Sequence, residues 1–224
     1  METLQLPKET NIERIREVAL EYLNQEPIKC EEFEHTVYHP FFNSDSFIDI
    51  VKPQMEGFIK KATNINTLFA LIDRRYKWRF FVDTMHSLSK SDFTKELKYI
   101  WIDSEGISAS AIPFDTFILM FNTANRKGLF EKSKNPQYDF KNFGEEIKIY
   151  RGICETGTTT TPMGMSWTVD YDKAYYFATR FFDEGYIIEG LVKKSDVLAY
   201  FTSRNEYEII VNPKSVKKTR KIEL

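Results

Sequence analysis

The sequence has few of the residues that make an enzyme site easy to find. It contains two cysteines and three histidines in 224 residues. Two cysteines are too few for a disulfide framework and suit a reducing compartment, so we predict a cytoplasmic protein. His35, His39 and His86 all precede Ser166 of the segment GMSWT. The order serine, acid, histidine of α/β-hydrolases is therefore excluded.

An excess of charge and long apolar runs are also lacking. The formal net charge is −2, so no overall field would attract nucleic acid or anionic lipid. No apolar run approaches the roughly 20 residues that a membrane-spanning helix needs. Residues 1–18 are charged throughout and contain no apolar core of a signal peptide. We therefore expect no membrane association and no secretion signal.

Glycine-rich phosphate loops and strong metal motifs are absent as well. No G-x-G-x-x-G occurs, which argues against a Rossmann dinucleotide site. The segment GICETGTT has Thr158 where a P-loop needs its lysine. Cys30, His35 and His39 could be offered to a metal, but their spacing matches no strong zinc pattern. We expect no metal cofactor.

Apolar and aromatic residues, by contrast, are plentiful. They make up 42% and 15% of the chain, enough for one large domain or two small lobes. The segment that follows Thr10 begins with a capping box and carries one apolar stripe, which predicts a helix ending before Pro27. Further helices are expected within residues 53–88, 91–106 and 113–128.

The residue pattern changes near position 144. EEIKIYRGI alternates with period two, and EGYIIEGLV and EYEIIV are short β-branched runs typical of strands. Between the first two runs, DYDKAYYFATRFF has the spacing of a helix. We therefore predict an α+β protein, with a mostly helical lobe over residues 1–143 and a strand-rich core over 144–224. The core is expected to hold a mixed β-sheet and to form one compact domain with the lobe.

Three short segments place polar side chains at the ends of predicted strands. They are IYRG (149–152), GMSWT (164–168) and NEYEIIVNP (205–213). Because side chains alternate along a strand, Ser166 and Thr168 should share one face. The same alternation places Glu206 and Glu208 together, while Arg151 should emerge on the core-facing side. Each segment alone could be an ordinary strand end or turn, but together they predict one cleft.

In this order the segments resemble the Arg–Ser–Glu class of mono-ADP-ribosyltransferases, which includes bacterial toxins, phage enzymes and vertebrate ectoenzymes. The resemblance covers residues 147–213 and rests on the arginine, on Ser-x-Thr and on Glu-x-Glu entering an apolar strand. It implies an ADP-ribosyltransferase-like core and NAD⁺ as substrate, cleaved between nicotinamide and ribose. Thr168 departs from the fullest pattern, which has a second serine there.

The resemblance implies a role for each matching residue. Glu208 would stabilise positive charge at the anomeric carbon, and Ser166 would hold Glu208 in place. Arg151 would clamp a phosphate, and Thr168 would line the same floor. Glu206 would orient the acceptor nucleophile or take its proton. The other implied NAD⁺ contacts are Gly152, Trp167, Phe177 and Phe181.

The acceptor of ADP-ribose is left open by these motifs. A Glu-x-Glu pair in this family is associated with arginine, which favours a protein acceptor. The basic stretches at 73–80 and 214–221 would suit RNA, unless they are a helix face and a solvated tail. Tyr200 or Phe201, in the segment just before Glu206, could contact the target.

Other functions remain open for the same residues. Water could replace the macromolecular acceptor, which would make the chain an NAD⁺ glycohydrolase. A non-catalytic binding module with a degenerate ADP-ribosyltransferase fold is the alternative from another class. An enzyme acting in the cell that makes it would suit a phage-defence or toxin–antitoxin effector, with an inhibitor or antitoxin protein as its partner.

Overall fold

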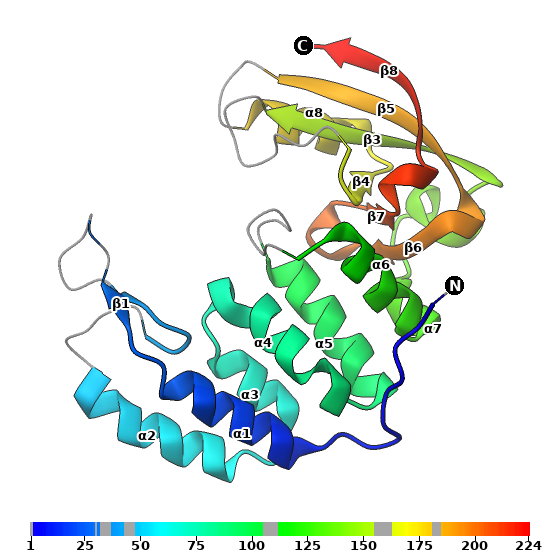
Figure 1. The fold of residues 1–224 in the computed structure, drawn as a ribbon. Helices are drawn as coiled ribbons and strands as arrows, with labels where there is room; N and C mark the ends of the chain where they lie inside the picture. The colour runs from blue at the N-terminus through cyan, green and yellow to red at the C-terminus, as the bar shows by residue number, and fades with distance from the viewer. Residues whose placement is uncertain are drawn as a thin grey trace. The chain divides into compact units, whose positions relative to one another are not determined.

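The computed structural model describes residues 2–29, 31, 37–42, 48–104, 112–154, 163–180 and 185–224. Within these residues it contains eight α-helices and a six-stranded antiparallel sheet (Figure 1). The predicted α+β class is confirmed. The chain divides into two compact units: a helical unit, Leu4–Glu105, and a sheet unit, Gly106–Leu224 together with Met1–Thr3.

The helical unit is built from amphipathic helices and one short ladder. Its described helices are α1 (Ile12–Leu23), α2 (Ile48–Lys61), α3 (Ile65–Leu71), α4 (Lys77–Thr84) and α5 (Lys90–Asp103), and its strands are β1 (Ile28–Lys29) and β2 (Val37–Tyr38). The side chain of Asn11 caps α1, accepting a hydrogen bond from the Arg14 amide at 3.1 Å. The N-cap is therefore Asn11, one residue after Thr10, and the capping box predicted from Thr10 to Glu13 is wrong. The Thr10 hydroxyl instead donates to Asp92 of α5 at 2.5 Å.

Aromatic side chains fill the core of the helical unit. Phe69, Phe80, Phe81 and Phe93 are each 0% exposed. The ring centroid of Phe81 lies 5.1 Å from that of Phe93 and 6.3 Å from that of Phe69. Tilted and edge-on contacts at such distances are the favoured geometry for aromatic pairs. No helix among the described residues has both the length and the apolar character needed to cross a bilayer.

The sheet unit is built around the six-stranded sheet. Its helices are α6 (Phe114–Thr123), α7 (Arg126–Leu129) and α8 (Tyr171–Thr179), and its strands are β3 (Glu146–Cys154), β4 (Ser166–Thr168), β5 (Gly185–Lys193), β6 (Val197–Phe201), β7 (Glu208–Val211) and β8 (Lys217–Glu223). The strand order is β6-β7-β4-β3-β5-β8. Every neighbouring pair is antiparallel. The prediction of a mixed sheet is therefore wrong.

The segment before β3 also belongs to the sheet unit. Phe130 forms a parallel bridge with Tyr200 of β6, and the Glu131 amide donates to the Tyr200 carbonyl at 2.9 Å. Arg126 donates to the carbonyl of Val197, also on β6, at 3.0 Å. The change of residue pattern at position 144 thus marks the first strand of this sheet, whereas the division between the units falls at 105–106.

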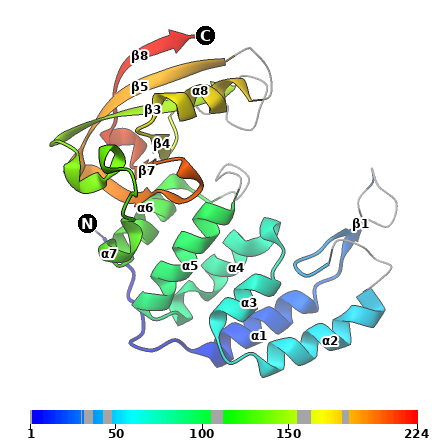
Figure 2. The same ribbon diagram turned by 180° about the vertical axis from the view of Figure 1, so that it is seen from behind.

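The two faces of the sheet pack against different parts of the unit. One face carries a core that includes Ile149, Trp167 and Ile209. The other face carries α8, which packs across β3 and β5 (Figure 2). Gly152 permits this close approach, because a Cβ there would lie 2.1 Å from the carbonyl oxygen of Ala174. Since α8 begins directly after β4, the packing of the helix fixes where the Ser-x-Thr strand ends.

Candidate functional site

Strands β4 and β7 bring Ser166 and Glu208 together. In the antiparallel register, Thr168 lies opposite Glu208 and Ser166 lies opposite Ile210. Residues that are directly opposite share a face, so both hydroxyls and the Glu208 carboxylate lie on one side of the sheet. The Ser166 hydroxyl donates to Glu208 Oε1 at 2.5 Å, across 42 residues of sequence. A hydrogen bond to a carboxylate is shorter and stronger than a neutral one, so Ser166 fixes the orientation of Glu208.

Arg151 is joined to the same pair through the main chain of β4. Its Nη1 donates to the Ser166 carbonyl at 2.5 Å. The guanidinium also packs against Gly164, where a Cβ would lie 2.5 Å from Nη2. Burial lowers the pKa of Arg151 to about 10, and the charge of Glu208 acts in the opposite direction. The guanidinium therefore stays positive at neutral pH and braces the strand that carries Ser166.

The register places Arg151 on the core-facing side, as predicted. It lies opposite Ile188, a member of the core that contains Trp167. Tyr150, which points to the other side of β3, lies opposite Thr168. Arg151 therefore leaves the sheet on the face opposite to the Ser166 hydroxyl, and its long side chain reaches the main chain of β4. The predicted residues form a chain of contacts from Arg151 through Ser166 to Glu208.

Glu206 is placed differently from the prediction. Strand β7 begins at Glu208, the backbone of Glu206 is helical (φ −90°, ψ −17°), and Tyr207 has a φ of 48°. Strand alternation does not apply here because the chain is not extended, so the reason given for pairing Glu206 with Glu208 is wrong. The Glu206 carboxylate lies 3.3 Å from the guanidinium of Arg204. Its carbonyl accepts a hydrogen bond from the Thr168 hydroxyl at 2.7 Å.

The other predicted NAD⁺ contacts have structural surroundings of their own. Trp167 is 2% exposed within the sheet core, and its indole nitrogen donates to the Gly164 carbonyl at 2.8 Å. Gly152 lies beneath α8. Phe177 is half-buried on α8, and Phe181 lies outside the described residues.

The aromatic residues before Glu206 do not face solvent. Tyr200 and Phe201 are 0% and 1% exposed and belong to β6. The hydroxyl of Tyr200 donates to the Tyr138 carbonyl. The prediction that Tyr200 or Phe201 contacts a target is therefore wrong. The exposed residues of this segment are Arg204 and Asn205, both at positive φ.

Two contacts at the site come from residues that the sequence did not single out for it. Gly164 leaves room for the Arg151 guanidinium. The sequence signal for this contact is that Gly164 opens the segment GMSWT, two positions before Ser166. Glu131 accepts hydrogen bonds from the amides of Thr202 and Ser203, which precede Glu206. No spacing or periodicity connects residue 131 with residue 202, so sequence patterns could not have found this contact.

Metal-binding groups are not found in the part of the chain that the structure describes. None of its His, Cys, Asp and Glu residues cluster in threes suited to an ion. His39 accepts a hydrogen bond from the Phe41 amide at Nδ1, and its Nε2 lies 3.1 Å from the Gln25 carbonyl. Both ring nitrogens are thus used within the protein. Cys30 and His35 lie outside the described residues.

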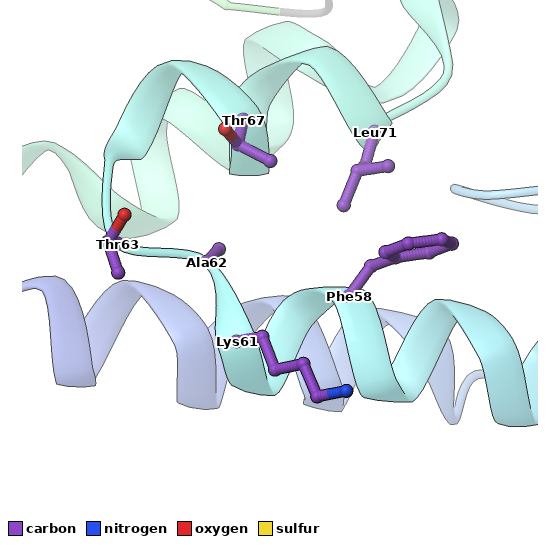
Figure 3. Close-up of a pocket in the computed structure, with 6 residues that line it drawn as sticks. All are labelled: Phe58, Lys61, Ala62, Thr63, Thr67 and Leu71. Carbon is purple, nitrogen blue, oxygen red and sulfur yellow. The ribbon is translucent and has the colours of Figure 1, made fainter.

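A pocket of about 360 Å³ lies in the helical unit between α2 and α3 (Figure 3). It is lined by Phe58, Lys61, Ala62, Thr63, Thr67 and Leu71. Figure 3 shows Phe58 and Leu71 facing each other at one end, with the lysine amine directed away from them. The lining has no carboxylate and none of the predicted site residues, and Lys61 is its one titratable side chain.

Comparisons of the chain with models of protein families, with curated proteins and with solved structures give no match. The function therefore has to be inferred from Arg151, Ser166 and Glu208 themselves.

Proposed function

We propose that this chain is a mono-ADP-ribosyltransferase, a glycosyltransferase that cleaves NAD⁺ and transfers ADP-ribose to a macromolecule. Protein arginine is the favoured acceptor, and RNA is the alternative. The observation that carries the proposal is the 2.5 Å hydrogen bond from Ser166 to Glu208. It fixes one carboxylate on strand β7, beside a strand held by a positively charged arginine. Cleavage of a glycosidic bond needs a carboxylate fixed in this way.

In the proposed reaction, the bond between the nicotinamide nitrogen and the anomeric carbon of ribose breaks. Nicotinamide leaves with the bonding electron pair, and positive charge develops on the anomeric carbon and the ring oxygen, as in glycoside hydrolysis. The Glu208 carboxylate stabilises this charge more strongly than it stabilises the ground state, which lowers the barrier. Ser166 keeps the carboxylate oriented, so little reorganisation is needed when the charge appears.

Arg151 would support this step, and Glu206 would act when the acceptor attacks. The guanidinium of Arg151 would act from the other face of the sheet: its bond to the Ser166 carbonyl holds β4, the strand that positions the Ser166 hydroxyl, so we assign it this bracing role instead of the phosphate contact. Glu206 would accept the proton of the acceptor nucleophile as its bond to the anomeric carbon forms. Protons and electrons then balance, because the acceptor loses one proton and nicotinamide leaves as a neutral molecule.

A second candidate, NAD⁺ hydrolysis, is favoured by one specific contact. The Glu206 carboxylate is 3.3 Å from Arg204, so a cationic acceptor would have to displace that guanidinium. Water has no such competitor and could attack the same anomeric carbon. Both candidates share the Glu208 step and differ in what accepts ADP-ribose.

Incubation of the purified protein with labelled NAD⁺ and cell lysate tests both candidates. We expect released nicotinamide together with a labelled macromolecule that protease destroys and ribonuclease does not. Label that ribonuclease alone removes would make RNA the acceptor, and nicotinamide release without labelled macromolecule would favour hydrolysis. No nicotinamide release at all would reject an enzyme of this class and leave the binding module.

Replacing Ser166 tests the hydrogen bond from Ser166 to Glu208 on which the proposal rests. Ser166→Ala removes the only group of that side chain that contacts Glu208, and we expect nicotinamide release to fall about 10-fold or more. Ser195→Ala is the control, because the hydroxyl of the exposed Ser195 bonds the carboxylate of its neighbour Asp196 at 3.1 Å and Ser195 belongs to no predicted site segment. Equal activity of the two variants would contradict the role of Ser166.

A further inference from the structure

The loop between β6 and β7 is held in a conformation that arginine and tyrosine do not favour. Arg204, Asn205 and Tyr207 have φ values of 62°, 56° and 48°. Side chains other than glycine rarely adopt this left-handed region, because Cβ approaches the backbone too closely. Such conformations persist only where surrounding contacts impose them, and they concentrate at functional sites. The loop carries Glu206 and leads directly into Glu208.

Glu131 holds the start of this loop. Its Oε2 accepts hydrogen bonds from the Thr202 amide at 2.6 Å and from the Ser203 amide at 3.1 Å. The Thr202 hydroxyl lies 3.3 Å from the same oxygen. Glu131 is itself anchored, because its own amide donates to the Tyr200 carbonyl of β6 at 2.9 Å. One carboxylate oxygen therefore fixes two successive amides of the first loop turn.

Tyr138 holds the end of the loop. Its ring stacks on that of Tyr207, with centroids 4.1 Å apart and planes 24° apart. Burial raises the pKa of Tyr138, and the charge of Asp170 and a hydrogen bond to it add to the effect. At the end of β4, the Thr168 hydroxyl and the amide of the next residue, Val169, donate to the carbonyls of Glu206 and Tyr207, at 2.7 and 3.3 Å. The left-handed turn is thus fixed from both sides.

We propose that Glu131 and Tyr138 are positioning residues that fix Glu206 for the acceptor, and this inference rests on the function proposed above. Both lie before residue 147, outside the segment that carries the three motifs. Glu208 is held separately, by Ser166 and by its pairing in β7. Loss of Glu131 therefore relaxes the acceptor side of the site and leaves the carboxylate that cleaves NAD⁺ in place.

Two substitutions at Glu131 test this separation with labelled NAD⁺ and cell lysate. Glu131→Ala should lower the ratio of ADP-ribose transferred to nicotinamide released by about 10-fold, because misplacing a group by about 1 Å can cost up to 10²-fold. The KM for NAD⁺ should stay unchanged. Glu131→Gln keeps an oxygen that can accept from the Thr202 amide, so the ratio should return to within about twofold of wild type.

Asp139→Ala is the matched control. The Asp139 carboxylate also accepts a backbone hydrogen bond, from the Lys141 amide at 3.1 Å, but this amide belongs to its own turn and not to the loop between β6 and β7. We expect the wild-type ratio in this variant. A ratio that falls equally in Glu131→Ala and Asp139→Ala would overturn the proposal, as would a parallel loss of transfer and hydrolysis in Glu131→Ala alone.

Hydrogen exchange separates failure of this inference from failure of the proposed function. The amides of Thr202 and Ser203 should exchange faster in Glu131→Ala than in wild type or Asp139→Ala, because their acceptor is gone. Unchanged exchange would overturn the inference even if the enzyme is active. Absence of nicotinamide release from the wild-type protein would reject the proposed function, and the exchange rates would still decide whether Glu131 holds the loop.

Discussion

The two units put polar groups to different use. In the helical unit, Lys77 and Glu96 are 6% and 3% exposed, inside a core of aromatic residues. The amine of Lys77 bonds Tyr99 and Asp103 of α5, so its charge ties one helix to the next. In the sheet unit, the Ser166 hydroxyl and the Glu131 carboxylate each form a hydrogen bond with a segment far away in the sequence.

The difference indicates where stability and chemistry reside. Contacts such as that of Lys77 join helices, and removing them should weaken folding. Contacts such as that of Ser166 orient a carboxylate on a strand whose apolar side chains supply most of the stability. Substitutions in the helical unit should therefore change the free energy of unfolding more than activity. Substitutions at the sheet site should do the reverse.

The largest effect on stability is expected from Phe81→Ala. Phe81 is 0% exposed and packs among Phe69, Trp78 and Phe93 of the same unit. Truncating a buried phenylalanine to alanine costs about 3–5 kcal/mol, so the midpoint of chemical denaturation should fall clearly. Nicotinamide release per folded molecule should be retained. An equally large loss of nicotinamide release under native conditions would show that the helical unit contributes to the site. Stability and chemistry would then not be divided between the two units.

The largest effect on activity is expected from Glu208→Gln. The amide keeps the shape of the side chain and removes the charge that stabilises the transition state. We expect nicotinamide release to fall about 10²–10³-fold, which is what losing a preorganised electrostatic contact typically costs. The denaturation midpoint should change little. Glu223→Gln, at an exposed position of β8, is the control and should release nicotinamide at the wild-type rate.

A pH-dependent effect on stability is expected from Glu96→Gln. Burial is the main cause that raises the pKa of Glu96 from 4.5 to about 7. Between these values the unfolded chain ionises the carboxyl and the folded chain keeps it protonated, so wild-type stability falls as pH rises from about 4.5 to about 7. The variant lacks this penalty. It should match wild type near pH 4.5 and exceed it by up to about 3 kcal/mol above pH 7.

Denaturation curves at pH 5 and pH 8 measure this difference. Glu9→Gln, at an exposed position before α1, serves as the control for the loss of one carboxylate. If both variants respond to pH alike, the buried position of Glu96 is not the cause. Nicotinamide release by Glu96→Gln should follow that of wild type at each pH, because Glu96 belongs to the helical unit.

Periodicity in the sequence predicted much of the architecture. The apolar stripe after Thr10 predicted α1, and the alternation in EEIKIYRGI predicted β3 with Ile147 and Ile149 buried. These predictions hold because a helix or strand must bury one regular face. The antiparallel pairing and the unit boundary depend on contacts between distant segments, for which one sequence carries no periodic signal. Residues 53–88, for which one or two helices were predicted, contain the end of α2 and all of α3 and α4.

At the candidate site, residue spacing predicted which side chains meet and did not predict how the loop runs. Alternation placed Ser166 and Thr168 on one face of β4, and the register of β4 and β7 adds Glu208 to that face. It failed at Glu206, because Tyr207 adopts a φ of 48° without being glycine. A glycine in that position would have signalled a turn. Two of the contacts that impose the turn come from Glu131 and Tyr138, which no motif connects to it.

The smallest effect is expected from Arg204→Ala, which sharpens the comparison within the sheet unit. Arg204 is exposed and its guanidinium lies 3.3 Å from the Glu206 carboxylate. An exposed ion pair contributes little to folding, so the denaturation midpoint should not change. If an acceptor guanidinium competes with Arg204 for Glu206, the variant should transfer ADP-ribose about two- to threefold faster and release nicotinamide at the wild-type rate. Arg204→Lys keeps the charge and should behave as wild type, whereas slower transfer in Arg204→Ala would mean that Arg204 helps to bind the acceptor.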